Sequence, residues 1–476
     1  MMAAYSKAEA LQPLWTVKSI CDAADAVSSG PDSAIFGLAI DSRDVREGDA
    51  FFAMPGTQMD GHDFVAMAFE KGAAIALVRR DWTPPETIDD ARLIRCDCPK
   101  QALIAMGVAR RAAVDAKIIG VTGSVGKTSL KDALFRCLGR ERLAHTNVRS
   151  FNNDVGVPLT LARMPLETQY GIFEMGMNHA GELTELSAWV RPHVALITTI
   201  ALAHYEHFEN EEGIADAKAE IFTSLAPGGT AILPADNKHF ARLKAAAEAC
   251  GAAHILTFGM ASSADVRPVT VSRHADCTAL SATIGDETLM FKVGIPGAHW
   301  VMNAIACLAG VKAIGGDLGL AGLSLAEMRA LPGRGAVTNV PVGGGSAQLM
   351  DDSYNANPAS VTAALETFAS VNVGARGRRI AVLGDMLELG EGAPALHAGL
   401  IEKVLAADVE ILICVGPLMA HLADAAQPHI SIFKVLDHAA ALSALKSTVR
   451  SGDAVLVKGS NSMQLGRLVS ALKDGA

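Results

Sequence analysis

The sequence predicts an α/β protein with three domains, and three observations lead to this fold class. The chain has 476 residues, which is too many for one hydrophobic core. Short apolar runs alternate with helical stretches through its middle and last parts, as in parallel sheets covered by helices. Turn-forming residues interrupt this rhythm at residues 81–85 and 331–335. We therefore expect domains over residues 1–98, 99–332 and 333–476.

The composition limits the partners and the location of the protein. Half of the residues are hydrophobic, 19% are charged, and the net charge is −10. This acidic balance and the absence of basic blocks argue against nucleic acid as a partner. Every apolar run is too short to span a bilayer, so we expect no membrane insertion. The N-terminus carries an acid and has no apolar centre, unlike a secretory signal. We expect a cytoplasmic monomer.

The cysteines indicate a reducing environment. Eight are spread along the chain, and only Cys96 and Cys98 lie close together. A C-x-C pair is not by itself a zinc spacing. Most of the others fall within apolar stretches, as reduced core cysteines do.

The first domain is expected to be a small α/β unit. Strand-like runs at residues 50–54 and 74–78 flank a helix over residues 63–71, which ends at Gly72. The turn at residues 81–85 then marks the approach to the next domain.

The central domain begins with a helix after Pro99 and then carries a phosphate loop. An apolar strand at residues 118–121 runs into a turn of small residues, and Lys127 opens a helix that stops at Gly139. Such a turn points backbone N–H groups and the helix dipole at an anion, and a lysine neutralises its charge. The residues expected to bind nucleotide phosphates here are Gly123, Ser124, Val125, Gly126, Lys127, Thr128 and Ser129.

The loop spacing departs from the common phosphate loop. Val121 stands where that pattern has its first glycine, so Gly123 begins a shorter loop. An ordinary glycine-rich turn would explain Gly123 and Gly126. It would not explain Gly-Lys-Thr-Ser at a helix start directly after an apolar strand.

The remaining elements complete two sheets. Central strands are expected at residues 170–175, 194–200, 230–233 and 254–258, with antiparallel strands over 266–293 and a helix entered from Pro296-Gly297. The last domain is expected to be Rossmann-like, with strands at residues 347–350, 379–383, 410–415 and 454–457 and a possible fifth at 430–435. It lacks the G-x-G-x-x-G fingerprint, so no dinucleotide is expected there.

Polar residues at strand ends suggest a metal site. Glu174 ends one central strand, His204 follows the next, and Asn152-Asn153 stands in a loop before Pro158. A carboxylate beside a phosphate loop suits Mg²⁺, which prefers oxygen ligands. Glu174 could instead cap a turn, and His204 could be a satisfied loop histidine. Together beside the phosphate loop, they favour the metal site.

Lys218 falls inside an apolar helix face, at i+4 from Ile214 and i−4 from Phe222. Its side chain could extend to the surface, which is the commoner outcome. Alternatively it is a desolvated, nucleophilic amine. Such an amine could react with CO₂ to form a carbamate, which would bind a second Mg²⁺.

The segment Asp351–Pro358, DDSYNANP, follows a strand of the last domain and precedes a helix. Pro358 at the first helical position and Asn357 as its cap are explained by capping alone. Capping does not explain the two acids, Tyr354 or Asn355. Residues 458–462 end the final strand in the same way. We therefore expect a second binding surface that faces the phosphate loop across a cleft.

These motifs resemble those of the Mur ligases, the ATP-dependent amide-bond-forming enzymes of peptidoglycan synthesis. The resemblance covers nearly the whole chain, through IDSR, DGHDF, TGSVGKTS, FNNDVGVPLTL, EMGMNHAGEL, AHYEHF, IADAKAEIF, DDSYNANP, LGDMLELG and VLVKGSNSM. DDSYNANP and LGDMLELG are typical of the members that add D-alanyl-D-alanine to UDP-N-acetylmuramoyl-tripeptide.

The resemblance implies a role for each matched residue. Lys127, His204 and Lys218 would be catalytic, Lys127 on the β- and γ-phosphates and Lys218 as a carbamylated lysine. Two Mg²⁺ ions are implied, with Thr128, Glu174, His204 and Lys218 as their ligands. Asn303 would lie near the adenine of ATP, and Arg334 and Asp352 would reach the nucleotide. The substrate-binding residues would be Ser42 and Arg43, which match a uridine-nucleotide signature, and Asn152, Asn153, Tyr354, Asn355 and Asn357.

The chain departs from the family pattern in three places. Thr199-Ile200-Ala201 replaces Asn-Ile-Gly, Asn461 replaces an arginine, and Gly466 replaces a common acid. The change at Asn461 removes a cation that could help to hold substrate or close the last domain.

The implied reaction begins when the tripeptide carboxylate attacks the γ-phosphate of ATP and forms an acyl phosphate. The amine of the dipeptide then displaces phosphate. A folyl-polyglutamate synthase would share the ATP site but not DDSYNANP, and a regulatory NTPase would hydrolyse ATP without an amine acceptor. The sequence leaves open whether the third residue of the tripeptide is diaminopimelate or lysine.

Overall fold

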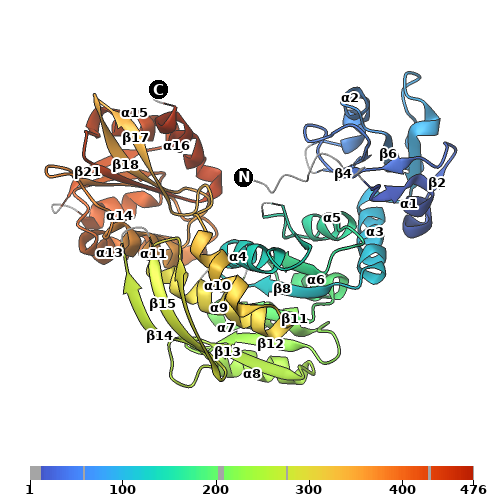
Figure 1. Cartoon of the computed structure of the whole chain (residues 1–476). Helices are drawn as coiled ribbons and strands as arrows, with labels where there is room; N and C mark the ends of the chain where they lie inside the picture. The colour runs from blue at the N-terminus through green and yellow to red at the C-terminus, as the bar shows by residue number, and fades with distance from the viewer. Residues whose placement is uncertain are drawn as a thin grey trace.

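The computed structural model describes residues 12–56, 59–148, 150–201, 208–274, 277–426 and 430–474. His204 lies outside these ranges. In the described part, the strands form three larger sheets and a small β1-β3 pair. Figure 1 shows three lobes along the chain, blue at the right, green and yellow at the base, and orange and red at the left. We call them the N-terminal, central and C-terminal domains.

The N-terminal domain contains a mostly parallel sheet in the order β2-β7-β6-β5-β4. Its strands are β2 (Val27–Ser28), β4 (Gly37–Ala39), β5 (Asp49–Phe52), β6 (Ile75–Arg79) and β7 (Leu93–Cys96), with β1 (Trp15–Thr16) paired to β3 (Ala34–Ile35). Helix α1 (Val17–Ala24) begins at a capping box formed by Thr16 and Ser19. The helix predicted over residues 63–71 begins as a 3₁₀ turn, Gly61–Phe64, and continues as α2 (Val65–Glu70).

The central sheet has the order β16-β15-β14-β13-β12-β11-β8-β10-β9. It is parallel from β9 to β14 and antiparallel across β14, β15 and β16, as predicted. The strands are β8 (Lys117–Thr122), β9 (Ala144–Thr146), β10 (Tyr170–Glu174), β11 (Val194–Ile197), β12 (Thr230–Pro234), β13 (His254–Phe258), β14 (Val266–Arg273), β15 (Thr278–Ile284) and β16 (Glu287–Val293). Strand β11 ends earlier than predicted because the next residues turn to hold the phosphate loop, with Thr198 N donating to Thr122 O.

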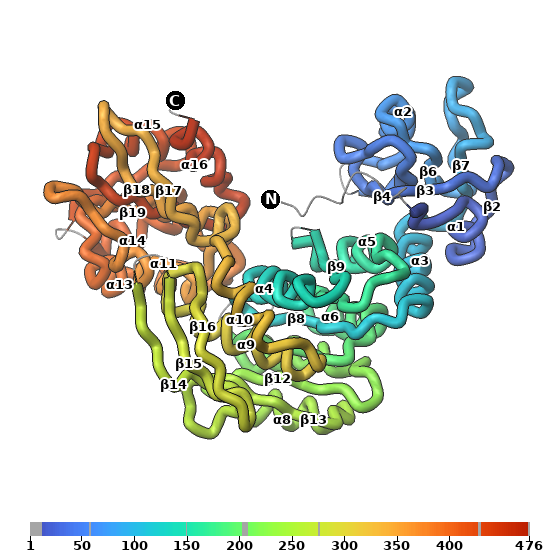
Figure 2. The backbone as a smooth tube through the Cα atoms, viewed as in Figure 1, coloured from blue at the N-terminus to red at the C-terminus, as the bar shows by residue number. Residues whose placement is uncertain are grey.

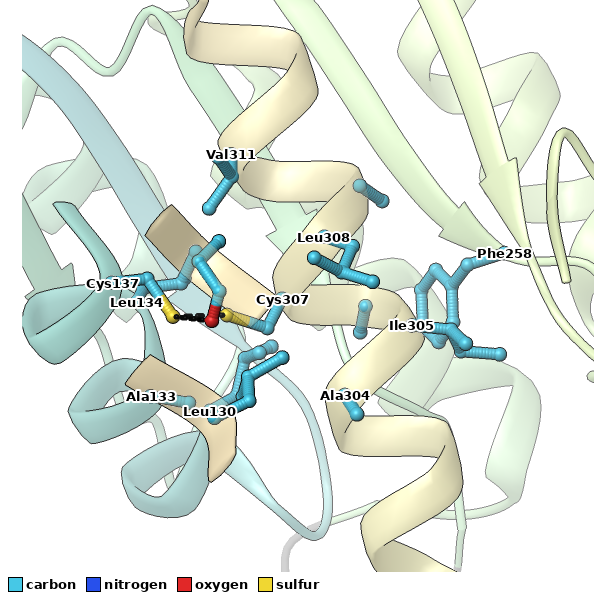
Figure 3. Close-up of a cluster of buried hydrophobic side chains, with 14 of the residues drawn as sticks. Leu130, Ala133, Leu134, Cys137, Phe258, Ala304, Ile305, Cys307, Leu308 and Val311 are labelled. Carbon is cyan, nitrogen blue, oxygen red and sulfur yellow. Dashed lines mark hydrogen bonds between the residues drawn. The ribbon is translucent and has the colours of Figure 1, made fainter. Parts of the chain in front are cut away.

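Helices cover both faces of the central sheet. They are α3 (Pro99–Ala113), α4 (Lys127–Gly139), α5 (Gly156–Ala162), α6 (Glu182–Val190), α7 (Glu211–Ala219), α8 (Phe240–Ala249), α9 (Ala298–Ile314) and α10 (Leu318–Glu327). Figure 3 shows the core between α4 and α9, where Leu134 and Cys137 face Cys307 and Leu308. The sulfur atoms of Cys137 and Cys307 lie 3.7 Å apart as thiols, so this core is built without a disulfide.

The C-terminal sheet has the order β17-β18-β22-β19-β20-β21 and is parallel except for the edge strand β17. Its strands are β17 (Ala336–Val342), β18 (Gly345–Asp352), β19 (Arg379–Gly384), β20 (Ile411–Val415), β21 (Ser431–Val435) and β22 (Ala454–Lys458). Its helices are α11 (Pro358–Phe368), α12 (Ala393–Ala398), α13 (Ile401–Ala406), α14 (Met419–Ala426), α15 (His438–Thr448) and α16 (Leu465–Lys473). A hydrophobic cluster on each face of the sheet packs against these helices.

The backbone trace shows that the long strands β14 and β15 run from the base of the central domain towards the C-terminal domain (Figure 2). Within the described ranges, no helix is both long and apolar enough to cross a membrane. The carboxyl ends of the parallel central strands carry the phosphate loop, and those of the C-terminal sheet carry DDSYNANP, so both sheets direct the predicted motifs to their strand ends.

Candidate active site

The phosphate loop is fixed by two glycines and by its neighbour strand. Gly123 has φ +143°, and a Cβ there would lie 1.8 Å from Thr198 Oγ1. Gly126 has φ +88° and precedes α4, and a Cβ there would lie 2.9 Å from Asn303 Oδ1. Larger residues would therefore clash at both positions. Ser124 N donates to Thr199 O at 2.9 Å, which ties the loop to the segment after β11.

The first turn of α4 places a cation and a hydroxyl at the loop. Lys127 Nζ donates to Gly123 O at 2.6 Å. Burial lowers the pKa of Lys127, while the nearby Glu174 carboxylate raises it and Arg334 lowers it further. Thr128 Oγ1 lies 3.4 Å from Ser150 Oγ and accepts a hydrogen bond from Arg334 Nη2 at 3.0 Å. Arg334 lies in the turn at residues 331–335 between the central and C-terminal domains, which we call the hinge. Its side chain therefore reaches the phosphate loop directly.

Glu174 presents a free carboxylate oxygen in a buried position. The residue is 1% exposed, and its Oε1 accepts a hydrogen bond from Asn152 Nδ2 at 2.7 Å. Its Oε2 is buried and has no hydrogen-bond partner among the residues that the structure describes. Asn147 also supports this position, because its Oδ1 accepts from Glu174 N at 2.7 Å. An orphaned buried carboxylate oxygen is costly, and a cation at this place would satisfy it.

Lys218 points into the core, as one reading of the sequence predicted. It is 1% exposed, which excludes extension to the surface. Burial lowers its pKa well below the ordinary value for lysine, and the positive charge of Lys127 lowers it further. The side chain therefore favours the neutral, nucleophilic amine.

The C-terminal domain contributes a second polar wall. Lys458, 3% exposed, donates to Asp352 Oδ2 at 2.7 Å and to Asn355 O at 2.8 Å. The guanidinium of Arg334 lies over the ring of Tyr354, 4.2 Å from its centroid. These contacts hold the DDSYNANP segment against the hinge.

One cavity of about 590 Å³ joins both walls. The predicted residues that line it are Ser124, Val125, Gly126, Lys127, Thr128, Ser129, Asn152, Glu174, Asn303, Arg334, Asp352, Tyr354, Asn355 and Asn357. Residues at the carboxyl ends of two separate sheets therefore meet in one space, which is the arrangement that the sequence analysis expected. Besides lining the cavity, Asn357 caps α11, as its Oδ1 accepts from Ser360 N at 2.8 Å.

Other predicted residues lie outside this lining. Asn153 Oδ1 accepts from Gly156 N at the start of α5. Ser42 and Arg43 stand in the N-terminal domain, where Ser42 is buried and Arg43 is exposed and paired with Asp41 at 2.6 Å. Gly123 and Lys218 are also not among the residues that line the cavity.

The cavity also contains residues for which the sequence analysis proposed no role. Polar examples are Ser150, Asp236, Asn237 and His299, and Lys458 had been noted only as the end of the final strand. Asp236 and Asn237 follow β12, so their strand-end position was a usable signal. Within the described ranges, no group of three or more His, Cys, Asp and Glu side chains forms a metal site. From the described residues, a site here would draw on Thr128 and Lys218 as well as Glu174.

The fold and the cavity define an α/β enzyme with a phosphate loop and a separate domain whose residues line the same cavity. Family models agree with this class. The Mur ligase family catalytic domain matches residues 34–123, the Mur ligase middle domain residues 121–311, and the Mur ligase glutamate ligase domain residues 338–461. The chain belongs to the Mur ligase family.

Individual relatives indicate which members of the Mur ligase family the chain resembles. The chain is 32% identical to the UDP-N-acetylmuramoyl-tripeptide–D-alanyl-D-alanine ligase of Escherichia coli, with 96% of this chain and 98% of that protein covered. The ligase of the same name from Bacillus subtilis is also 32% identical, with the same coverage. A crystal structure of MurF from Acinetobacter baumannii superposes with a TM-score of 0.82 at 28% identity, over 98% of this chain and 99% of that chain.

Proposed function

We propose that this enzyme uses ATP to join D-alanyl-D-alanine to UDP-N-acetylmuramoyl-tripeptide in the synthesis of peptidoglycan precursors. The observation that carries the proposal is the single cavity lined by the phosphate loop, Glu174 and the DDSYNANP segment. The two 32% identical relatives with this name, covered almost end to end, support the choice of substrates.

ATP binds with its phosphates over the phosphate loop. Lys127 and the N-terminal amides of α4 neutralise the β- and γ-phosphates. Asn303, which already lies against Gly126, faces the base, and Arg334 and Asp352 reach the nucleotide from the hinge and the C-terminal domain.

The residues present fit Mg²⁺. Thr128 supplies a hydroxyl, Glu174 supplies its orphaned Oε2, and His204 and Lys218 complete the proposed ligands. When bound, two such ions supply positive charge that stabilises a phosphoryl group in transfer. Asn152 orients Glu174 by binding its other oxygen, so its contribution to substrate binding is through this carboxylate.

Lys218 acts as a carbamate. The neutral amine next to Lys127 reacts with CO₂, one proton is released to solvent, and the product is a carbamate anion. A protonated Lys218 would be repelled by Lys127, whereas the carbamate is attracted to it. The negative charge then adds a carboxylate-like ligand beside Glu174.

Each domain handles one substrate. Residues 1–98 bind the UDP-sugar through Ser42 and Arg43, residues 99–332 bind ATP, and residues 333–476 bind the dipeptide through Tyr354, Asn355 and Asn357. The cavity is complete within one chain, which supports a monomer. ATP supply and the reduced Cys137–Cys307 pair support a cytoplasmic location.

The reaction proceeds in two steps. The tripeptide carboxylate attacks the γ-phosphorus, ADP leaves, and an acyl phosphate forms. The neutral amine of the dipeptide then attacks the acyl carbon, and inorganic phosphate leaves from the tetrahedral intermediate. Closure of the C-terminal domain excludes water, which would otherwise hydrolyse the acyl phosphate.

Phosphate release from ATP tests the proposal. We expect release with UDP-N-acetylmuramoyl-tripeptide to rise strongly when D-alanyl-D-alanine is added, with one amide formed per phosphate. Release that is indifferent to the dipeptide would refute a ligase. Activity with glutamate and a folate, but not with the dipeptide, would favour a folyl-polyglutamate synthase.

A further inference from the structure

His299 lies in the wall of the nucleotide cavity, and nothing above assigns it a role. It stands in the first turn of α9, one turn before Asn303, and both side chains line the cavity. Its position is close to the C-terminal domain, because a Cβ on Gly297 would lie 2.8 Å from His299 Cε1 and 3.1 Å from Thr367 Oγ1 of α11.

The two ring nitrogens of His299 have different surroundings. Nδ1 is buried and has no hydrogen-bond partner within the described ranges. The nearest hydroxyl, Thr367 Oγ1, donates instead to Ala363 O at 2.9 Å. Nε2 is not such an orphaned buried atom, and because His299 lines the cavity, we infer that Nε2 is the ring nitrogen available to a ligand.

This asymmetry determines where the proton sits. Burial lowers the pKa of His299, so the ring is neutral and carries one proton. A buried N–H without an acceptor costs more than a buried lone pair, whose desolvation is smaller. The tautomer with the proton on Nε2 is therefore favoured. The wall of the cavity then presents one N–H donor without a protein acceptor.

The charges around His299 indicate which part of a nucleotide it faces. Asp352 raises its pKa and Lys458 lowers it, and both belong to the C-terminal domain. At the phosphate loop, by contrast, Lys127 is influenced by Glu174 and Arg334. Asn303 lies against Gly126 of the phosphate loop. His299, one turn earlier in α9, lies beside Gly297 and near Thr367 of the C-terminal domain, so His299 is farther from the phosphate loop.

We propose that His299 donates a hydrogen bond from Nε2 to an acceptor on the nucleoside part of ATP. The residue then contributes to the selection of a nucleotide over a bare polyphosphate. This inference rests on the proposed use of ATP but not on the identity of the peptide substrates.

Equilibrium binding of ADP and of inorganic tripolyphosphate, each with Mg²⁺ and without peptide substrates, tests the role. His299→Leu should weaken ADP binding about tenfold, since a nucleoside acceptor loses its donor, and should leave tripolyphosphate binding unchanged. The amide nitrogen of glutamine can occupy the place of Nε2, whereas that of asparagine can occupy only the place of Nδ1. His299→Gln should therefore retain most of the ADP affinity, and His299→Asn should lose it. Trp300→Phe, which changes the neighbouring ring, should bind ADP normally.

Unchanged ADP affinity in His299→Leu would overturn the proposal. Equal weakening of ADP and tripolyphosphate would also overturn it, because the ring would then support the shape of the whole site. If His299→Leu fails to fold, equal ADP affinities of the glutamine and asparagine variants refute the proposal, and a gap between them supports it. Failure of the unaltered protein to bind ADP would instead refute the use of ATP.

Discussion

The two flanking domains are joined to the central domain in different ways. The N-terminal domain shares one hydrophobic cluster with it, in which Trp15 and Phe52 pack with Leu103 and Leu159. Hydrogen bonds reinforce this joint, since Trp15 Nε1 donates to Ala162 O at 2.8 Å. The two domains therefore have a common core and should behave as one body.

The joint with the C-terminal domain is polar. The C-terminal clusters are built from residues 340–472, and the central ones from residues 114–330. The hydrogen bond of Arg334 to Thr128 crosses this joint, and Tyr354 of the C-terminal domain holds the arginine by stacking. Such contacts can be exchanged with ligand at small cost, whereas a shared core cannot be opened without exposure of apolar surface.

The difference between the polar and the apolar joint bears on where the proposed reaction takes place. The cavity lies at the polar joint, where closure can bring ATP and the dipeptide together. The apolar joint fixes the N-terminal domain, so that the carboxylate of a long substrate can be held at a constant distance from the phosphate loop. Substitutions at the polar joint should change activity, and those at the apolar joint should change stability.

The largest expected effect on activity is at Lys218, in the central domain. Lys218→Ala should lower kcat roughly 10⁴-fold, because the proposed metal site loses a negative ligand. The free energy of unfolding of the metal-free protein should change little, since alanine removes an amine whose burial is costly and keeps the apolar helix face. Steady-state ligase assays measure kcat, and unfolding experiments measure the free energy of unfolding. A short carboxylate or bicarbonate should restore part of the activity, and no restoration would count against the carbamate.

Trp15→Ala tests the apolar joint. Loss of this ring should lower the free energy of unfolding by about 3–5 kcal/mol, from lost burial and the lost bond to Ala162. The stacked Arg110, 4.4 Å over the ring, would also lose its partner. Trp15→Phe is the matched control and should recover most of the loss. If the N-terminal domain of Trp15→Ala unfolds while the rest melts unchanged, the two domains do not share a cooperative core.

The sequence predicted most strands because they are apolar runs with clear turn signals at both ends. Strand β13 (His254–Phe258) was predicted to the residue, and β8 and β10 nearly so. Strand β17 was missed, since most of its residues are exposed and it contains Pro341 on the sheet edge. The helix expected to carry Ile214, Lys218 and Phe222 ends at Ala219 and changes to a 3₁₀ turn at Glu220–Phe222.

The candidate site was predictable where it uses strand ends and helix starts. Lys127 and Glu174 could be placed together because the parallel strands of the central sheet deliver their carboxyl ends to one edge, and Asp352 could be placed at the strand ends of the second sheet. Asn147 and His299 could not, since their roles depend on how a loop path and a helix start lie against other elements. Neither position has a local pattern that distinguishes it from an ordinary polar residue.

Arg334→Lys tests the polar joint. Lysine keeps the charge but lacks the planar group that reaches Thr128 while it stacks on Tyr354. We expect kcat to fall about tenfold and stability to stay within about 0.5 kcal/mol. The exposed pair of Arg136 with Asp132 provides a control, and Arg136→Lys should leave both unchanged. A large loss of stability in Arg334→Lys would mean that this joint is as structural as the other.

Per single pH unit, the smallest expected effect is the pH dependence of the apolar joint. Burial lowers the pKa of His145 from 6.5 to about 4, and Arg163 and Arg110, which bind Leu38 O and Leu14 O across the joint, add to the shift. The unfolded chain therefore binds a proton at a higher pH than the folded one does. Stability should be complete above pH 6.5 and decline towards pH 4, by at most about 1.4 kcal/mol per pH unit. His145→Gln should flatten this decline in unfolding experiments between these values, while His254→Gln, on an exposed residue of β13, should not. An equal slope in His145→Gln and the unaltered protein would show that the acid sensitivity arises outside this joint.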